Sequence, residues 1–325
     1  MGSSESSANK PRVQLERLLK LARGLPPLPM AVVHPVDEES LSGALDAGLQ
    51  GLIEPVLVGP EQRIRRCADK AGLDLGQTRL VDTEHSHEAA DTAAAMAASG
   101  EVAALMKGSL HTREFMGAIV PRAVGLRTGR RMSHVWVMDV PSYPRPLLIT
   151  DSAINIRPDL MTKADIVQNA IDLAAAMGTA NPRVAIISAT EEVNPSLQST
   201  VDAAALCKMA ERGQIRGGRL DGPLAFDNAI SEEAAEAKGI GGEVAGRADI
   251  LLAPDVESAN MLGKQLHYLA GADAAGIVLG ARVPLVLTSR ADDRFARQAA
   301  CAIAQLMHKA EQEGRDRALR ERQGL

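Results

Sequence analysis

Five groups of polar side chains follow short apolar segments of the chain, and together they could line one binding cleft. They are Lys107 with Ser109; Asp151 with Asn155; Ser188, Thr190, Glu191 and Asn194; Asp255, Glu257 and Asn260; and Ser289, Arg290, Asp292 and Asp293. Ligands of open α/β sheets bind beyond the carboxyl ends of the strands. A single group of this kind is usually turn chemistry, but five in one chain favour a shared cleft.

The segment MKGSLHT, residues 106–112, has the features of an anion site. Gly108 would let the backbone approach a ligand closely, and Ser109 or Thr112 could cap the helix that follows. The first turn of a helix offers free N–H groups to an anion. An ordinary strand, turn and well-capped helix would explain the same residues, and the two interpretations are about even.

A cationic patch lies in the segment VPRAVGLRTGRRMSH. Its members fall within ten positions: Arg122, Arg127, Arg130 and Arg131. In a chain of net charge −5, this local excess of guanidinium groups suits a phosphate group. Standing alone, the segment would be interpreted as a solvated loop.

Nucleotide-binding and metal motifs are missing or misplaced. No GxxxxGK[ST] loop is present, and the glycine-rich stretch 239–246 follows a helix and precedes a strand, which is the wrong order for a dinucleotide site. His85 and His87 have no third ligand nearby in the sequence, so a metal site is not expected. Cys67, Cys207 and Cys301 are far apart, which disfavours a zinc knuckle or a disulfide framework.

Composition excludes several classes of protein. Hydrophobic residues make up 46 % and charged residues 24 %, which argues against a mainly disordered chain. Aromatic residues are only 2 %, and the net charge is negative, so neither a stacking platform nor a polyanion surface for nucleic acid is expected. No apolar run approaches the ~18 residues of a membrane span. The first residues lack the pattern of a secretory signal, so we expect a cytoplasmic, reduced protein.

These side chains need a layered α/β scaffold. Strands expected at 30–37, 55–60, 101–108, 183–189, 248–254, 275–281 and 283–289 alternate with helical patterns, which favours a largely parallel sheet. The segments 134–140 and 144–151 are joined through three prolines, which predicts an antiparallel pair or an edge. The last helix is expected over 293–314, followed by a charged tail. Changes of pattern near Trp136 and Gly280 predict two α/β domains: residues 1–137 with 282–325, and an inserted domain at 138–281.

Several of these segments together resemble the phosphate acetyl/butyryl transferase family. The matching stretches are MKGSLHT, LLITDSAIN, SATEEVNPSLQSTVDAAAL, DGPLAFDNAIS, GRADILLAPDVESANMLGKQL and AGIVLGARVPLVLTSR, in the family's order from about residue 100 to 300. EEVNP and GPLAFDNA are more similar to the butyryl branch, and to the transferase half of proteins that join a hydratase to a phosphate acyltransferase. No hydratase module fits in this chain.

The resemblance implies a fold similar to that of isocitrate and isopropylmalate dehydrogenases. That fold has two three-layer α/β domains, the second inserted in the first, with a cleft between them, and the family forms homodimers. The resemblance also implies reversible transfer of a short acyl group, acetyl to butyryl, between coenzyme A and inorganic phosphate through an acyl phosphate. It implies no metal, no tightly bound cofactor and no acyl-enzyme.

The resemblance assigns the central chemistry to Ser289 and Arg290, which match the family's catalytic Ser-Arg pair. Arg290 would bind phosphate, and Ser289 would donate a hydrogen bond to the developing oxyanion or to the thiol. The other polar residues of the matching segments and the arginine patch become expected substrate contacts: Lys107, Gly108, Ser109, His111, Thr112, Arg127, Arg130, Asp151, Asn155, Ser188, Glu191, Asp255 and Asn260.

The general base departs from the family pattern. A thiol is mostly protonated at neutral pH, so a carboxylate base or a cationic environment would help the attack. The acetyl enzymes of the family carry an essential Asp seven residues after the catalytic Ser, and Ala296 occupies that position here. Asp292, Asp293 or Asp255 could replace it, or the mechanism could need no strong base.

Two other functions remain open at this level. A dehydrogenase of the same fold would use a divalent metal and a nicotinamide cofactor, but the Ser-Arg pair and the lack of a dinucleotide loop disfavour it. A non-catalytic protein that senses coenzyme A or acyl phosphate is compatible with the missing Asp. The length of the acyl chain cannot be predicted from these motifs, because one methylene changes discrimination by only ~1–3 kcal/mol.

We expect Arg290→Ala to lower turnover by roughly 10² or more, since an aligned donor to developing charge contributes a few kcal/mol. Arg290→Lys should recover little, because the bidentate fork is lost. The measurement is the steady-state rate of acyl transfer at saturating substrates. An alanine variant with near-wild-type turnover would contradict the assignment.

Overall fold

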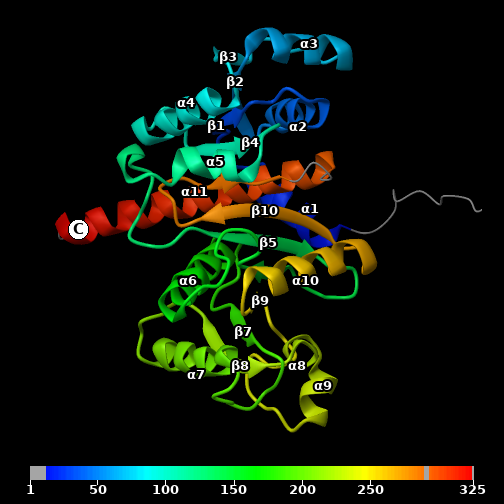
Figure 1. Cartoon of the computed structure of the whole chain (residues 1–325), viewed down its shortest axis with the longest axis vertical. Coiled ribbons are helices and arrows are strands. Elements are labelled where there is room, and N and C mark those ends of the chain that lie inside the picture. Colours follow the sequence, from blue (N-terminus) through cyan, green and yellow to red (C-terminus); the bar gives the residue numbers. More distant parts are fainter. Residues whose placement is uncertain (1–11, 289–292, 324–325) are drawn as a thin grey trace, which may run out of the picture.

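Eleven strands form one sheet in the computed structural model, which describes residues 12–288 and 293–323. The order across the sheet is β3-β2-β1-β4-β11-β10-β5-β6-β9-β7-β8 (Figure 1). The strands are β1 (Leu28–Val33), β2 (Ile53–Gly59), β3 (Arg79–Asp82), β4 (Ala104–Lys107), β5 (Ser133–Asp139), β6 (Leu147–Thr150), β7 (Arg183–Ile187), β8 (Arg219–Leu224), β9 (Ile250–Leu252), β10 (Asp273–Leu279) and β11 (Leu285–Val286).

The sheet contains two parallel blocks that run in opposite directions. Strands β3, β2, β1, β4 and β11 are parallel to one another, as are β6, β9, β7 and β8. Between the blocks, β10 pairs antiparallel with β11 and β5, and β5 pairs antiparallel with β6. The expected antiparallel pair of 134–140 and 144–151 is thus confirmed as β5 and β6. The expectation of a layered α/β fold with a largely parallel sheet is confirmed as well.

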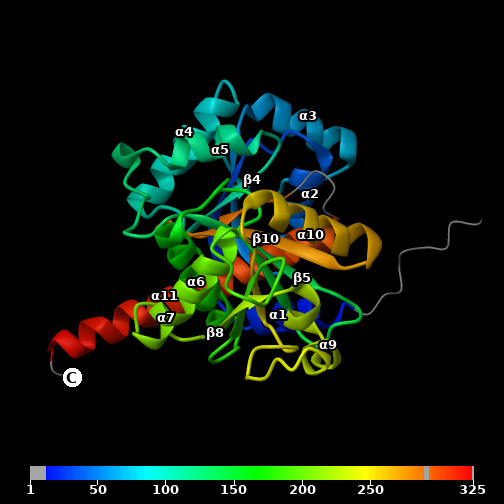
Figure 2. The ribbon, with the colours of Figure 1, turned by 60° about the horizontal axis from the view of Figure 1, so that its bottom comes forward.

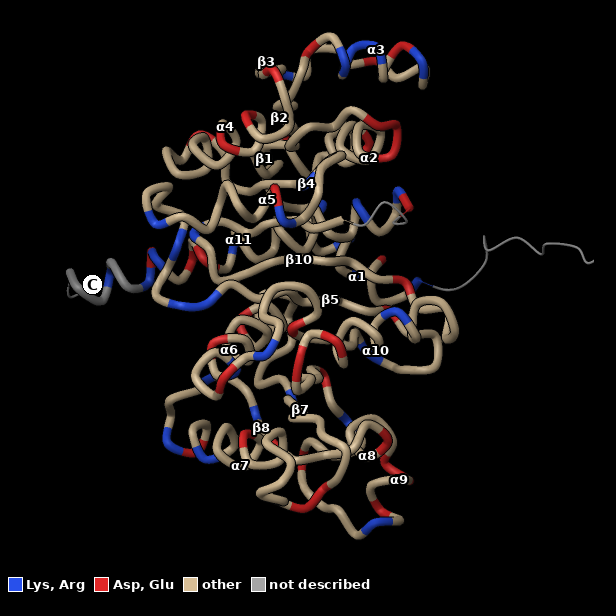
Figure 3. The backbone as a smooth tube through the Cα atoms, in the orientation of Figure 1, with Lys and Arg blue, Asp and Glu red and all other residues tan. Residues whose placement is uncertain are grey.

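The helices cover both faces of the sheet. They are α1 (Val13–Ala22), α2 (Glu38–Leu49), α3 (Glu61–Ala71), α4 (Ser86–Ser99), α5 (Thr112–Ile119), α6 (Leu160–Ala176), α7 (Gln198–Glu211), α8 (Phe226–Ile230), α9 (Glu232–Ala237), α10 (Val256–Leu269) and α11 (Arg294–Gln323), with a 3₁₀ turn at Arg122–Val124. Lys and Arg are interspersed with Asp and Glu along these helices and their loops (Figure 3).

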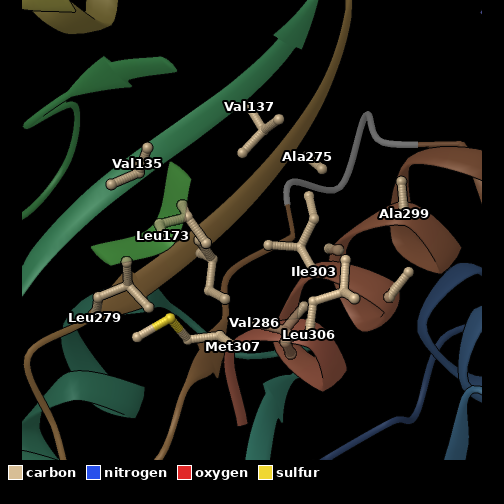
Figure 4. Packing of buried hydrophobic residues seen from close by; sticks show 14 of the residues in the cluster. Val135, Val137, Leu173, Ala275, Leu279, Val286, Ala299, Ile303, Leu306 and Met307 are labelled. Atoms are coloured by element: carbon tan, nitrogen blue, oxygen red, sulfur yellow. The ribbon is translucent and has the colours of Figure 1, made fainter. Parts of the chain in front are cut away.

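One face of the sheet has a single core, and the other has two. On the first face, side chains of α1, α2, α6, α7 and α11 join one buried cluster with every second residue of the strands. Figure 4 shows Ile303, Leu306 and Met307 of α11 in this cluster with Val135, Ala275 and Leu279 of the central strands. On the opposite face, α4 and α5 pack over the first block, whereas α8, α9 and α10 pack over the second. A gap between two separate covers therefore lies on this face.

The last helix extends beyond its expected end. α11 continues through Gly314 to Gln323, whereas the sequence predicted a stop near Gly314 and a charged tail. Ion pairs one turn apart support the extension, including Lys309 with Glu313 and Arg315 with Glu311. Figure 1 shows α11 lying across the middle of the molecule. The predicted domain boundaries stay a prediction; residue 137 lies inside β5, and residue 281 follows β10.

Candidate active site

A cavity of about 360 Å³ opens on the face with two covers, between the start of α5 and the side of α10. In Figure 2, α10 lies in front of the central strands of the sheet, and its Gly263 lies against Trp136 of β5. The cavity is lined by Lys107, Leu110, His111, Thr112, His134, Trp136, Ser152, Ala153, Asn260, Gly263, Lys264, His267, Tyr268, Ala274, Leu287 and Thr288. No Asp or Glu stands among these lining residues. Among residues 12–288 and 293–323, no cluster of three His, Cys, Asp or Glu could hold a metal, and no helix could cross a membrane.

The strand register brings the ends of both parallel blocks to this cavity. β4 and β11 stop side by side, where the Leu287 N–H donates to the Gly276 carbonyl at 3.2 Å. Gly276 pairs with Trp136 on β5, and β6 ends at Thr150 opposite Val135. The carboxyl ends of oppositely directed strands therefore meet near the middle of β10 and the start of β5. Two of the predicted polar groups, those after β4 and β6, lie beside this line, and the chain leaves β11 here at Thr288.

The backbone of Gly108 lies so close to β1 that only glycine fits at this position. A Cβ at this position would lie 2.4 Å from the Val33 carbonyl oxygen. The Gly108 N–H donates to that oxygen at 2.9 Å, and the Ser109 N–H donates to His34 at 3.0 Å. The close backbone approach is present and is made to β1, and Gly108 also lines the hollow beside Lys107. As a substrate contact it stays a prediction.

The helix after Gly108 begins differently from the sequence prediction. α5 starts at Thr112, with His111 in the N-cap position and no side-chain cap, so the predicted capping by Ser109 or Thr112 is wrong. Ser109 instead lies close enough to Asp37, the N-cap of α2, to lower the pKa of its carboxyl group. Among the residues that the structure describes, no side chain caps the first N–H groups of α5, and His111 and Thr112 line the cavity there.

Two buried cations lie behind the cavity in a second hollow, also of about 360 Å³. Lys107 is 7 % exposed and lines both hollows, and Arg297 is 3 % exposed and lines the second. Arg297 Nη1 donates to Thr288 Oγ1 at 2.8 Å, and Thr288 Oγ1 donates to the Lys107 carbonyl at 3.3 Å. These contacts hold the end of β11 against the end of β4, directly before Ser289.

Asp37 faces the same hollow as Arg297. Burial favours a higher pKa for Asp37, but hydrogen bonds from Ser109 and Ser40, with the Arg297 charge, outweigh burial and lower its pKa. Arg297 reaches the hollow by crossing α2 at Gly43, where a Cβ would lie 2.5 Å from Arg297 Cδ. The sequence analysis missed Arg297, although a single Arg within the apolar stripe of the last helix was a usable signal.

Asp151 and Asn155 organise the loop after β6. Asp151 is 3 % exposed, and its carboxylate accepts hydrogen bonds from the N–H groups of His134, Ala153, Ile154 and Asn155 at 2.9–3.1 Å. Burial raises the pKa of Asp151, against the opposing effect of these bonds. Neither side chain lines the cavity, whereas Ser152 and Ala153, which this loop positions, do.

The remaining predicted residues are dispersed. Asn260 lines the cavity and donates from Nδ2 to the Ser152 carbonyl at 3.1 Å. Asp255 caps α10 by accepting from Ser258. The others lie outside the cavity lining. The side chains of Ser188, Glu191 and Arg130 form hydrogen bonds with Ser199, with Lys238 and Asn228, and with Asp172, respectively. Arg127 forms an isolated backbone β-bridge with Ala281. As substrate contacts they stay predictions. The sequence analysis missed Lys264, His267 and Trp136 of the lining, because single residues inside a helix or strand carry no motif.

The candidate catalytic residues lie at and beyond the end of β11. Ser289, Arg290 and Asp292 lie outside the described residues. Asp293 caps α11 by accepting from the Ala296 N–H at 2.8 Å, and its other oxygen accepts from Arg12 at 2.8 Å. This is the capping role that an Asp before a helix commonly has.

His134 is a buried imidazole in the cavity wall. Its Nδ1 has no hydrogen-bond partner among the residues that the structure describes, and its ring packs edge-on against Trp136 with centroids 5.5 Å apart. Burial lowers the pKa of His134 to about 4. The side chain is therefore neutral at physiological pH.

Comparisons with known proteins agree with the motifs. A family model described as "Phosphate acetyl/butaryl transferase" matches residues 84–304. A phosphate acetyltransferase of Rhizobium meliloti is 58 % identical over 90 % of this chain and 92 % of its own length. A phosphate butyryltransferase of Clostridium beijerinckii is 42 % identical over 90 % of this chain and 97 % of its own length.

Solved structures share the fold. A branched-chain phosphotransacylase from Enterococcus faecalis aligns with a TM-score of 0.73 and 26 % identity, over 86 % of this chain and 99 % of that one. A 4-hydroxythreonine-4-phosphate dehydrogenase from Klebsiella pneumoniae aligns with a TM-score of 0.53 and 14 % identity, over 87 % and 99 %. The second likeness concerns the fold alone, and it agrees with the dehydrogenase-like architecture expected from the sequence.

The packing of Arg297 on α2 generates a stability prediction. Gly43→Ala should lower the thermal unfolding midpoint, by the equivalent of about 1–3 kcal/mol, because the new methyl group must displace the Arg297 stem. Gly314→Ala is the matched control: it lies within α11 with nothing near its Cβ position. The control should be neutral or stabilising, since Ala favours a helix over Gly by ~1 kcal/mol. Equal midpoints for the two variants would contradict the packing.

The buried His134 generates a pH prediction. Its folded pKa of about 4 lies below the unfolded value of 6.5, so the folded state binds fewer protons between these values. Stability should therefore fall as pH drops from about 6.5 to 4, by up to about 3 kcal/mol from this group. Urea unfolding across that range should show a shallower fall for His134→Gln. His111→Gln, at an exposed histidine whose side chain has no hydrogen bond or ion pair among the described residues, should follow the wild type. An unchanged profile for His134→Gln would refute the prediction.

Proposed function

The chain belongs to the phosphate acetyl/butyryl transferase family, and from this premise we propose that its cavity is where a short acyl group moves reversibly between coenzyme A and inorganic phosphate. The proposal rests on one observation: most of the chain is similar in sequence to curated phosphate acetyl- and butyryltransferases. The chain is a phosphate acyltransferase. Coenzyme A as the substrate of this cavity, and acetyl to butyryl as the range of acyl groups, are the finer proposals.

In the proposed reaction, the thiolate of coenzyme A attacks the carbonyl carbon of the acyl phosphate. The C–S bond forms, the C–O bond to phosphate breaks, and phosphate leaves with the electron pair. Negative charge builds on the carbonyl oxygen and on the leaving phosphate, so the site needs preorganised donors. The buried side chains of Lys107 and Arg297 support a phosphate position at the ends of β4 and β11. A positive charge attracts a phosphate more strongly in the protein interior than in water, because the local dielectric constant is lower.

Ser289 and Arg290 are proposed as the catalytic pair. They follow Thr288 directly, and Thr288 lines both hollows and bonds to Arg297. Arg290 would bind the phosphate, and Ser289 would donate to the oxyanion or the thiol. The support for the pair is the family motif and this position in the chain.

The surroundings of the cavity favour a thiolate without a strong carboxylate base. Asp293 is engaged by Arg12 and the start of α11, and Asp255 by the start of α10. The described part of the lining holds two lysines, Lys107 and Lys264, and no carboxylate. Cationic neighbours lower the pKa of a thiol and stabilise its anion. Asp292, which lies outside the described residues, stays the candidate if a carboxylate base is used.

Three further properties belong to the proposal: how coenzyme A binds, the oligomeric state and the location. Coenzyme A would bind as a dissociable substrate, with no metal and no tightly bound cofactor. A homodimer is supported by exposed apolar side chains such as Ile156 and Met161 around the start of α6. A cytoplasmic location stays a prediction. The dehydrogenase alternative has only a likeness of fold in its favour.

The test is release of coenzyme A from acetyl-, propionyl- and butyryl-CoA by the purified full chain. Release should require phosphate, and arsenate should replace phosphate. Lys107→Met should raise the KM for phosphate by about tenfold or more, the effect of losing one charge-assisted contact. Lys20→Met, on the exposed side of α1, is the control and should match the wild type.

Each contrary outcome has a distinct meaning. Release without phosphate would indicate a thioesterase. Binding of coenzyme A without any release would indicate a sensor. A rise in the unfolding temperature with NAD but not with coenzyme A would indicate a dehydrogenase.

A further inference from the structure

The wall of the cavity has a polar end and an apolar end. Lys107, His134 and Thr288 form the polar end, where β4 and β11 stop and β5 begins. Trp136, Ala274 and Leu287 form the apolar end on the sheet. On α10, Gly263 faces the indole, and the polar Asn260, Lys264 and His267 line the cavity beside it. A pocket with few polar groups at one end and an apolar wall at the other is suited to a small amphiphilic ligand.

Trp136 dominates the apolar end because its neighbours on the sheet are small. On β10, its direct partner is Gly276, and Ala274 lies diagonally opposite on the same face. A Cβ on Gly276 would itself lie 2.7 Å from the Leu287 carbonyl oxygen and 2.9 Å from His134 Nε2. The space over Gly276 is therefore filled by the His134 ring and the Leu287 carbonyl, and Ala274 is the small residue that leaves room beside the indole.

Trp136 and α10 together fix the width of the cavity. A Cβ on Gly263 would lie 2.1 Å from both Cε3 and Cζ3 of Trp136, so the indole lies directly against the helix backbone. The His134 ring packs perpendicular to the indole, with ring centroids 5.5 Å apart. With the helix on one side and His134 on another, the ring has little freedom to move aside for a longer ligand.

We propose that Trp136, Ala274 and Leu287 form the subsite for the acyl chain, and that Trp136 sets the longest chain accepted. The inference rests on the proposed function, since it assumes that the reacting carbonyl lies at the polar end. With the carbonyl beside Lys107 and Thr288, the hydrocarbon of the acyl group extends over the apolar wall. A cavity of about 360 Å³ has room for a short acyl phosphate and the thiol end of coenzyme A.

The test compares kcat/KM for acetyl-, butyryl- and hexanoyl-CoA with saturating phosphate. Trp136→Leu should raise the hexanoyl-to-acetyl ratio by about tenfold or more, because added space favours each further methylene. Trp136→Phe should give a smaller shift in the same direction. Ala274→Val should shift the ratio the opposite way, since its new methyl groups narrow the floor.

The control is Ala103→Val, the same substitution at a half-buried residue before β4 that does not line the cavity. Its ratio should equal that of the wild type. A wild-type ratio in the folded Trp136 and Ala274 variants, or an equal loss for all three acyl groups, would overturn the proposal. If Trp136→Leu does not fold, the Phe and Val variants decide. A wild type that releases no coenzyme A from any acyl-CoA would instead reject the proposed function.

Discussion

The antiparallel pairing of β10 with β5 is the contact on which the candidate site depends. These two seven-residue strands pair along their whole length, and they join parallel blocks that run in opposite directions. In a sheet whose strands were all parallel, the carboxyl ends of the strands would all lie at the same end of the sheet. Here the ends of β4 and β11 approach from one side and the end of β6 from the other. The cavity exists because the two sets of ends meet beside Gly276 and His134.

Buried charge is concentrated behind this meeting point, and the fold arranges partners for it. A buried guanidinium is costly unless it is bonded and paired. Arg297 donates a hydrogen bond to Thr288, and its charge interacts electrostatically with the Asp37 carboxylate. Its side chain can pass over α2 because residue 43 is glycine. Asp151 has a comparable position in the second block, where its carboxylate collects N–H groups of the loop after β6. In each block, one buried ionisable side chain positions the residues that line the cavity: Arg297 at the end of β11, and Asp151 in the loop after β6.

The sequence predicts most of the scaffold and part of the site. Buried strands such as β1 and β10 are apolar along their length, and amphipathic helices such as α11 show a clear period, so both were predicted. The two edge strands, β3 (Arg79–Asp82) and β8 (Arg219–Leu224), are half exposed and polar, and they carry no apolar pattern to find. Polar groups after strands pointed to Lys107, Thr112 and Asn260. Trp136, Gly263 and Arg297 were missed because their roles arise from contacts between elements that are distant in the sequence.

The unbroken sheet also determines how the molecule can deform. One core runs beneath both blocks, with α11 packed across the central strands. Separating the two blocks from each other would break the hydrogen bonds between β10 and β5 and would also expose that core. A change of sheet twist, or a rigid displacement of α5 and α10 over the strands, breaks neither. The continuous ladder therefore ties the two sides of the cavity, α5 on one block and α10 on the other, to one twisted surface.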